Sequence, residues 1–305
     1  MGRPGPVLSQ RRQPIVIDNY PTLHQMNLII QAAQPIAITH LDHLGKLSRS
    51  SQREQISAHA FRLAAAAHHP EIAPYCLENR IDYGFVPPGR SLREIGLVVM
   101  DMDSTLITIE CIDEIADMQG LKPGVAAITE AAMRGELDFA ESLRRRVALL
   151  EGLDEHALQR VYDERLGLSP GAETMLAALK SHGIRTLLVS GGFVFFTERL
   201  RARLGLDYTR ANTLETANGK LTGKVSGKII DAQGKADSLV NIRDELGLKP
   251  EQVIAIGDGA NDLKMMAQAG TSIAYHAKPV VRDQADYALN FVGLDGLVNL
   301  LSDRQ

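Results

Sequence analysis

The stretch LVVMDMDST at residues 97–105 joins a short apolar run to two aspartates and two hydroxyl residues. An apolar run of this length, preceded by Gly96 and followed by polar residues, predicts a buried β-strand. Ligands of open α/β sheets bind where the strands end, so Asp101 and Asp103 are expected at a functional site. Neighbouring carboxylates repel each other unless a cation or a shared proton compensates. A plain Asp-rich turn is the alternative that this stretch alone leaves open.

Two further apolar runs also end in polar, glycine-rich segments. The run TLLV at 186–189 leads into SGG at 190–192, and the run VIAI at 253–256 leads into GDGAND at 257–262. Lys235 lies between these segments. Strand-like runs that alternate with helical patterns predict an α/β fold, in which a parallel sheet carries helices on its faces. A loop hinge is the structural alternative for Gly191 and Gly192.

The order of these segments resembles that of the four motifs of the haloacid dehalogenase (HAD) superfamily of phosphotransferases. The first motif, DxDxT, is met at 101–105, the second by Ser190, the third by Lys235, and the fourth, GDxxxD, at 257–262. The resemblance implies a Rossmann-like parallel sheet core with an inserted helical cap. Within the superfamily the chain resembles the phosphoserine phosphatase family, on the segments ECIDEIA (110–116), MRGELDF (133–139), SLRRRV (142–147), SGGF (190–193) and IAYHAKP (273–279).

The resemblance assigns the core motifs to phosphoryl transfer through an aspartyl-phosphate. It implies Asp101 as the nucleophile and Asp103 as the general acid and base, and a covalent intermediate would split one difficult step into two. Mg²⁺, a hard cation that takes oxygen ligands, would let a carboxylate approach a phosphate. The implied metal ligands are the carboxylates of Asp101 and Asp258 and the backbone carbonyl of Asp103, with Asp262 just behind them. The implied phosphate-binding groups are Ser190, the Gly191 N–H, Lys235 and Asn261.

Three residues after the first motif are expected to recognise the rest of the substrate, which in the resembled family is O-phospho-L-serine. Arg146 is suited to a carboxylate because its planar fork binds two oxygens. Glu110 is suited to an ammonium, and Phe139 would form an apolar wall. Successive helical residues point about 100° apart, so Arg144, Arg145 and Arg146 cannot all serve one site, and only Arg146 matches the family pattern. A solvated helix face for the arginines and a plain surface acid for Glu110 stay open.

The activity implied by the resemblance is Mg²⁺-dependent hydrolysis of O-phospho-L-serine to L-serine and phosphate, the last step of serine biosynthesis. Transfer of the phosphoryl group to homoserine, or hydrolysis of another small phosphate ester, uses nearly the same motifs. A signalling receiver module with a phosphate-accepting Asp and a Lys is a third hypothesis. Asp103 and the long insertion after the first motif argue against that module.

We expect four segments along the chain. They are a flexible lead-in rich in Pro, Gly and Arg (1–13), a small N-terminal α/β domain of unknown role (14–90), a catalytic core in two pieces (91–108 and 169–305), and a helical cap inserted over the site (109–168).

Several short segments have local patterns that predict their secondary structure or environment. Residues 27–30 and 36–38 are typical of strands, and the Ala-rich stretch 52–67 is typical of a helix. Asn218-Gly219 predicts the turn of a hairpin within 214–225. His40 and His43 flank Asp42, but their spacing favours packing or solvated histidines over a metal site.

The composition limits the partners and the compartment that we expect. The 305 residues are 45% hydrophobic and carry a net charge of −4, which predicts no attraction to nucleic acid or an anionic membrane surface. Two cysteines, Cys76 and Cys111, favour a reducing compartment. No apolar run approaches the roughly 18 residues of a membrane span, and no apolar run follows the N-terminal arginines as in a signal peptide. We expect a cytoplasmic enzyme with a small-molecule substrate; a homodimer is an open possibility that the sequence does not decide.

Overall fold

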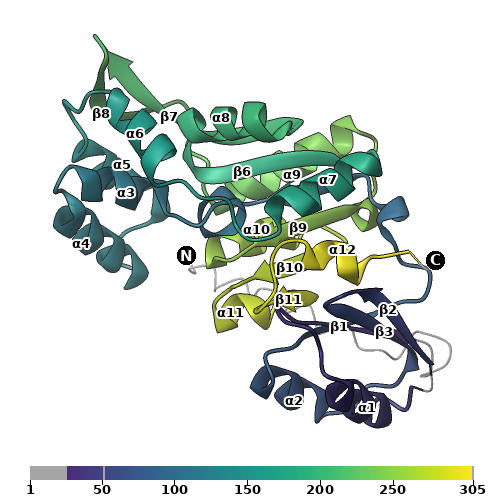
Figure 1. Cartoon of the computed structure of the whole chain (residues 1–305). Helices are drawn as coiled ribbons and strands as arrows, with labels where there is room; N and C mark the ends of the chain where they lie inside the picture. Colours follow the sequence, from purple (N-terminus) through teal and green to yellow (C-terminus); the bar gives the residue numbers. More distant parts are fainter. Residues whose placement is uncertain (1–25, 51, 304–305) are drawn as a thin grey trace, which may run out of the picture.

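The computed structural model describes residues 26–50 and 52–303, arranged around two β-sheets (Figure 1). The expected lead-in at 1–13 lies outside the described residues. The larger sheet has seven strands in the order β11-β10-β9-β5-β6-β7-β8, and all neighbours are parallel except β7 and β8. Its strands are β5 (Leu97–Met100), β6 (Arg185–Phe193), β7 (Tyr208–Ala217), β8 (Lys220–Ser226), β9 (Val253–Gly257), β10 (Thr271–Tyr275) and β11 (Tyr287–Leu289).

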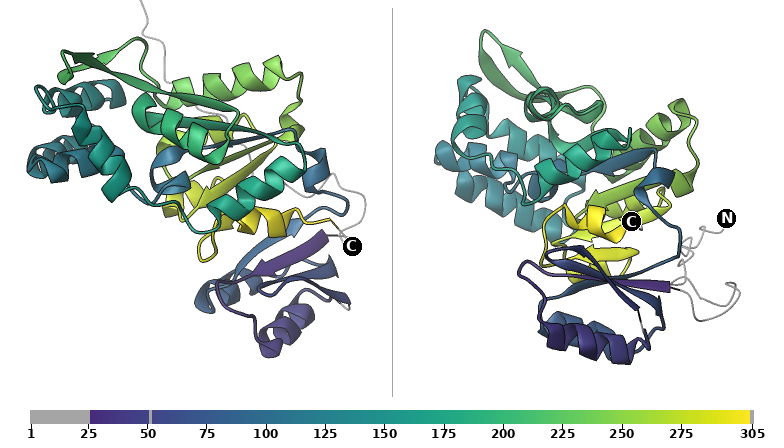
Figure 2. Two further views of the ribbon diagram at one scale, coloured as in Figure 1. Left: turned by 45° about the horizontal axis from the view of Figure 1, so that its top comes forward. Right: turned by 45° about the vertical axis from the view of Figure 1, so that its right-hand side comes forward.

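Helices cover both faces of this sheet, as the continuous apolar runs of its central strands require (Figure 2). Val98 and Met100 of β5 pack with one set of helices, whereas Val99 packs with the other. The first set is α7 (Ala172–Ser181), α8 (Val194–Leu204) and α12 (Gly296–Leu300). The second set is α9 (Ala232–Glu245), α10 (Leu263–Met266) and α11 (Pro279–Arg282).

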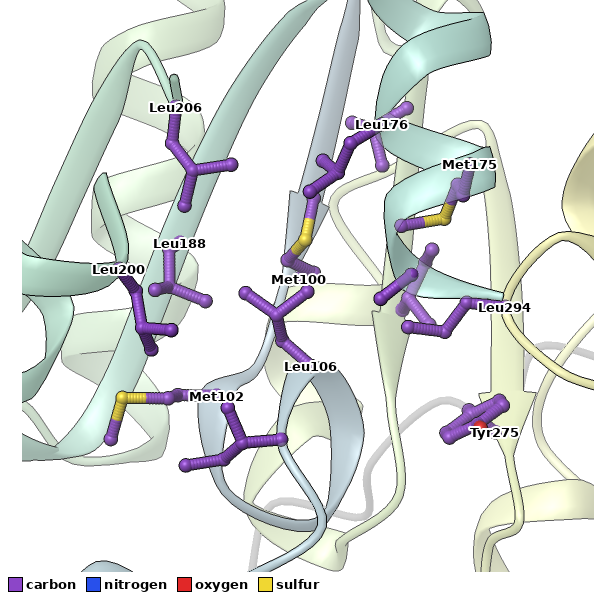
Figure 3. Close-up of a cluster of buried hydrophobic side chains, with 14 of the residues drawn as sticks. Met100, Met102, Leu106, Met175, Leu176, Leu188, Leu200, Leu206, Tyr275 and Leu294 are labelled. Atoms are coloured by element: carbon purple, nitrogen blue, oxygen red, sulfur yellow. The ribbon is translucent and has the colours of Figure 1, made fainter. Parts of the chain in front are cut away.

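The core of the first face forms a continuous cluster of large side chains (Figure 3). Met100 of β5 and Leu188 of β6 lie in it with Met175 of α7 and Leu200 of α8. All four side chains are fully buried. The predicted α/β architecture is therefore confirmed, and the packing holds the carboxyl ends of β5 and β6 side by side.

A helical insertion separates β5 from β6, as predicted for a cap. It contains α3 (Cys111–Met118), α4 (Lys122–Met133), α5 (Phe139–Ala148) and α6 (His156–Glu164). Two chain segments join it to the core and are hydrogen-bonded to each other, from Thr108 N to Gly167 O at 2.9 Å and from Ser169 N to Leu106 O at 3.0 Å. The cap is therefore connected to the core by a paired, two-chain neck.

Strands β7 and β8 extend the sheet as a hairpin beside the cap, at the turn predicted from the sequence. Asn218 and Gly219 both have positive φ angles, 52° and 74°, as a two-residue hairpin turn requires. Leu221 of β8 is hydrogen-bonded to Gly152 and Leu153 of the cap. The hairpin is thus a third contact between the core and the cap.

The smaller sheet has four antiparallel strands in the order β2-β3-β1-β4. Its elements are β1 (Met26–Gln31), α1 (Ile38–Leu47), β2 (Gln52–Ser57), β3 (Ala60–Ala66), α2 (Ile72–Glu78) and β4 (Asp82–Val86). This βαββαβ succession is the ferredoxin-like arrangement. Leu28 and Ile30 of β1 face α1 and α2, whereas Ile29 and Val86 belong to the core of the larger unit.

Two local predictions in this part of the chain were wrong. The stretch 52–67 is not a helix but the hairpin β2–β3, because pairing of β3 with both β1 and β2 overrides the helical preference of its alanines. Residues 36–38 are not a strand, because Ile38 begins α1. The three-residue spacing of the buried Leu41 and Leu44 sets the helical period there.

The small sheet is fixed to the core at the β11 edge of the larger sheet, by hydrogen bonds to the segment that follows β11. The buried Asp82 carboxylate accepts the backbone N–H groups of Asn290, Phe291 and Val292 at 2.8 to 3.0 Å. Gln31 bonds to the backbone of Gly296 at 3.3 Å. None of the helices formed by residues 26–50 and 52–303 has the length and apolar content needed to traverse a bilayer.

The two histidines that flank Asp42 pack on an aromatic ring. His40 Nδ1 is 2.8 Å from the hydroxyl of Tyr75, and the ring of His43 stacks on the same tyrosine at 4.2 Å. This contact accounts for both residues and agrees with their interpretation as packing histidines.

Candidate active site

A pocket lies where β5, β6 and β9 end, beneath the cap. Most of the residues that the sequence singled out line it together. The lining residues are Asp101, Asp103, Glu110, Ile112, Phe139, Leu143, Arg146, Gly191, Gly192, Phe193, Lys235, Asp258 and Asn261. Of the predicted set, Ser190 and Asp262 do not line the pocket, but each is hydrogen-bonded to a residue that does.

Lys235 joins two buried carboxylates at the base of the pocket. Its Nζ atom lies 2.7 Å from Asp101 Oδ1 and 2.8 Å from Asp262 Oδ1. Burial alone would lower the pKa of Lys235, but the negative charges of Asp101 and Asp262 raise it, so the ammonium stays charged. Burial and the charge of Asp262 raise the pKa of Asp101, and Lys235 opposes that rise. The backbone N–H of Met102 also donates to Asp101 Oδ1 at 2.7 Å and fixes the carboxylate.

Asp103 is held from both sides. Its Oδ1 accepts the backbone N–H of Cys111, the first residue of cap helix α3, at 2.9 Å. Its Oδ2 accepts the hydroxyl of Ser190, at the end of the buried part of β6, at 3.2 Å. Burial raises the pKa of Asp103, so its carboxyl holds a proton more readily than an exposed aspartate does. A carboxyl with those properties is suited to giving and taking protons.

Three acidic side chains converge around Lys235 at the base of the pocket. Ligand oxygens of Asp101, Asp258 and Asp262 lie within 4.8 Å of one another. Asp258 accepts the hydroxyl of Thr105 at 3.0 Å, and Asp262 accepts the backbone N–H of Gly259 at 3.1 Å. Burial and the charge of Asp262 raise the pKa of Asp258. A set of hard oxygen donors with more negative charge than Lys235 can balance fits a hard divalent cation.

Glu110 and Arg146 bring opposite charges from the cap to the same pocket. Glu110 is an exposed residue, but its carboxylate lies in the cleft, where desolvation and the charge of Asp103 raise its pKa to about 7. Burial lowers the pKa of Arg146, and the carboxylates of Asp113 and Glu110 oppose that effect. The pocket can therefore meet a ligand that carries both an ammonium and a carboxylate.

The neighbours of Arg146 in the arginine run point elsewhere. Arg144 and Arg145 are exposed and form ion pairs with Glu141 at 4.0 Å and 2.7 Å. Phe139 projects from the start of α5 toward Gly191, where an added Cβ would lie 2.8 Å from the ring. Glycine at this position therefore lets the cap and the end of β6 approach each other closely.

Several contacts of the site were not foreseen from the sequence. Ser104 donates its hydroxyl to Glu110 Oε1 at 2.7 Å, and Thr105 bonds to Asp258. The DxDST stretch contained both residues, so their position in the motif was the available signal. Asn212 of β7 donates to Gly191 O at 2.8 Å and accepts the N–H of Ile230 at 2.7 Å. It joins the end of β6 to the segment before α9, and no pattern in the sequence around it indicated this role.

Comparison with known proteins agrees with this geometry. A family model described as haloacid dehalogenase-like hydrolase matches residues 98–267, a span that contains the DxDxT motif, Lys235 and the GDxxxD motif. The chain belongs to the haloacid dehalogenase-like hydrolases. A second model, for a domain of unknown function, matches residues 28–72 in the smaller sheet.

Several relatives of this hydrolase, in sequence and in structure, are named phosphoserine phosphatase. A phosphoserine phosphatase from Polaromonas sp. is 55% identical over 236 residues, which cover 76% of this chain and 98% of the relative. The structure of a probable phosphoserine phosphatase from Vibrio cholerae matches with a TM-score of 0.81 and 37% identity, over 91% of this chain and 86% of that one. A phosphoserine phosphatase solved as a phospho-aspartyl intermediate analogue matches with a TM-score of 0.64 and 38% identity, over 68% of this chain and 99% of that one. These likenesses confirm the HAD-type fold predicted from the sequence.

Proposed function

We propose that this hydrolase cleaves O-phospho-L-serine to L-serine and phosphate through an aspartyl-phosphate on Asp101, as the last step of serine biosynthesis. The observation that carries the proposal is one pocket in which the Asp101–Lys235 pair faces both Glu110 and Arg146. Phosphoserine has a phosphate, an ammonium and a carboxylate, and the pocket offers a charged partner to each. The relatives named phosphoserine phosphatase support the same substrate.

The metal that we propose is Mg²⁺, held by the carboxylates of Asp101 and Asp258 and by the backbone carbonyl of Asp103. When bound, it would neutralise charge between the carboxylates and the phosphate. The convergence of three carboxylates around one ammonium supports this assignment. Asp262 would act behind the ligands, because its Oδ1 is bonded to Lys235 and its Oδ2 to Gly259.

In the first step, a carboxylate oxygen of Asp101 forms a bond to phosphorus while the bond from phosphorus to the serine oxygen breaks. Asp103 gives its proton to that departing oxygen. In the second step, Asp103 takes a proton from a water molecule, and the water oxygen displaces Asp101 from phosphorus. Lys235, Asn261 and the Gly191 N–H, with Ser190 beside them, hold the phosphoryl oxygens during both steps.

The cap selects the rest of the substrate in this proposal. Arg146 binds the carboxylate, Glu110 binds the ammonium, and Phe139 closes the apolar side. The segment boundaries given above, the cytoplasmic location and the homodimer stay predictions.

The test is release of phosphate from O-phospho-L-serine, O-phospho-L-threonine and sugar phosphates, each with Mg²⁺ and with EDTA. We expect phosphoserine to be hydrolysed fastest, and only with the metal. A parallel reaction with added homoserine distinguishes hydrolysis from transfer. Phosphohomoserine as the main product would replace the proposal with a phosphotransferase, and equal rates on sugar phosphates would replace it with a general phosphatase.

A further inference from the structure

Ser104, in the turn Met102–Leu106 that follows β5, has a backbone conformation that is rare for a residue with a side chain. Its φ is 54° and its ψ is 2°, in the left-handed region. Backbone strain of this kind persists where the surrounding structure holds it in place, and it is concentrated at functional sites. Here the turn sends the Ser104 hydroxyl to Glu110, and the distance from Oγ to Oε1 is 2.7 Å.

The backbone around Ser104 closes on the start of the cap. Ser104 N donates to Ile109 O at 3.2 Å, and Ile107 N donates to Met102 O at 3.0 Å. The N–H of Cys111 then bonds to the Asp103 carboxylate. The backbone next to Ser104 and Glu110 is therefore hydrogen-bonded on both sides, and the Ser104–Glu110 bond forms within this hydrogen-bonded loop.

Glu110 is also the residue that precedes helix α3, a position where a side chain often caps the helix. Its carboxylate does not do so. Among the described residues, Ser104 is the one hydrogen-bond donor to that carboxylate, and Glu110 lines the same pocket as Arg146. With Oε1 held by Ser104, Oε2 is available for a ligand.

We propose that Ser104 is a positioning residue for amine recognition: it holds Glu110 so that Oε2 meets the ammonium of the substrate. The inference rests on the proposed function and deepens it. Ser104 touches neither the phosphate nor the reacting atoms in this account. The same turn that carries Asp103 thereby sets the distance between the reacting centre and the amine of the substrate.

The test compares three substrates that differ in one group each: O-phosphoserine, O-phosphoethanolamine, which lacks the carboxylate, and 3-phosphooxypropanoate, which lacks the ammonium. In Ser104→Ala we expect KM to rise about three- to tenfold for the two substrates that carry an ammonium, because a bond to a charged group is lost. KM for 3-phosphooxypropanoate should stay at the wild-type value. Adding Ser104→Ala to Glu110→Gln should cause no further change.

Two variants separate the hydroxyl from the backbone. Ser104→Gly also lacks the hydroxyl but relieves the left-handed strain, so a loss equal to that of Ser104→Ala assigns the effect to the hydroxyl. Thr108→Ala alters the same loop through its bond to Gly167 O, and it should leave all three KM values unchanged. Equal losses on all three substrates, no loss on any, or the same pattern in Thr108→Ala would each overturn the inference. Wild-type enzyme that turns over 3-phosphooxypropanoate but not phosphoserine would instead refute the proposed function.

Discussion

The core and the cap contribute to the same pocket, but they hold their charged groups in different ways. In the core, Asp101, Lys235 and Asp262 are at most 5% exposed and are bonded to one another. In the cap, Glu110 is exposed and Arg146 is half-buried; the Glu110 carboxylate accepts the Ser104 hydroxyl, and the Arg146 guanidinium makes a weak hydrogen bond to Ser142 O at 3.4 Å. The groups of a buried, hydrogen-bonded network are already in place, so they need little rearrangement when charge develops on a phosphate. Groups at a partly open wall are suited to choosing between substrates.

This contrast predicts that changes in the core affect every phosphate ester, whereas changes in the cap affect only esters with the matching groups. The neck at Thr108–Gly167 and the contact of Phe139 with Gly191 join the two regions. Variants that separate chemistry from selection therefore test the comparison directly.

The largest expected effect is that of Asp101→Asn. The amide is nearly the same size and can still accept the N–H of Met102, but it is a poor nucleophile and loses the charge that faces Lys235. We expect kcat/KM to fall by at least about 10⁴-fold on every phosphate ester. Thermal unfolding should show a folded protein. Retention of a substantial part of the activity would contradict the covalent mechanism.

Removal of the metal should have the next largest effect. EDTA should abolish phosphate release, and Mg²⁺ should restore it, because three converging carboxylates oppose the approach of a phosphate. Ca²⁺ should restore little activity, since its larger and looser coordination would misplace Asp101. Calorimetric titration of Mg²⁺ into Asp258→Asn gives an affinity that tests whether Asp258 is a ligand. Asp237→Asn, on the exposed face of α9, is the control. Equal affinities in the two variants would remove Asp258 from the site.

A smaller effect should follow from the ionisation of Glu110. In the metal-free protein its pKa is raised to about 7, so the carboxylate is mostly protonated below that pH and gains its charge above it. Binding of L-serine should therefore tighten about fivefold or more from pH 6 to 7.5, because the ammonium needs the charged form. Calorimetry on wild-type protein and on Glu110→Gln measures this difference. A pH-dependent affinity that persists in Glu110→Gln would assign the titration to another group.

The smallest effect on activity should come from the N-terminal sheet. Asp82→Ala leaves the N–H groups of Asn290, Phe291 and Val292 without their acceptor, so the free energy of unfolding should fall by about 2–4 kcal/mol. Asp42→Ala, which removes an exposed ion pair with Arg53, is the matched control and should cost less than about 1 kcal/mol. Denaturant unfolding gives both values. Well below the unfolding temperature, kcat/KM should equal the wild-type value, and a large loss would show that the sheet takes part in the site.

The core could be predicted from the sequence because its strands are continuous apolar runs and its polar residues follow those runs directly. Asp101, Ser190 and Asp258 each come within two residues of a buried strand segment, and parallel strands bring such positions to one edge. The roles of Glu110 and Arg146 depended on resemblance, because helical spacing alone does not say which face of a cap meets the core.

The small sheet was harder to predict because its stability depends on distant pairing. Alanine favours helix locally, yet β3 is held between β1 and β2. The motif drew attention to Ser104 but not to its partner Glu110, and no pattern pointed to the contact between Asn212 and Gly191. The first contact depends on a left-handed turn and the second on a side chain of strand β7, and neither leaves a periodic pattern in the sequence.

The division of labour between core and cap is tested most directly by Arg146→Ala, assayed with O-phosphoserine and with 4-nitrophenyl phosphate, which has no carboxylate. We expect kcat/KM for phosphoserine to fall about 10- to 100-fold, because a charge-assisted pair is lost, and kcat/KM for 4-nitrophenyl phosphate to stay unchanged. Arg145→Ala, which removes an exposed ion pair one residue away, should change neither. Equal losses on both substrates in Arg146→Ala would contradict the account, because Arg146 would then serve the phosphate or the fold of the cap.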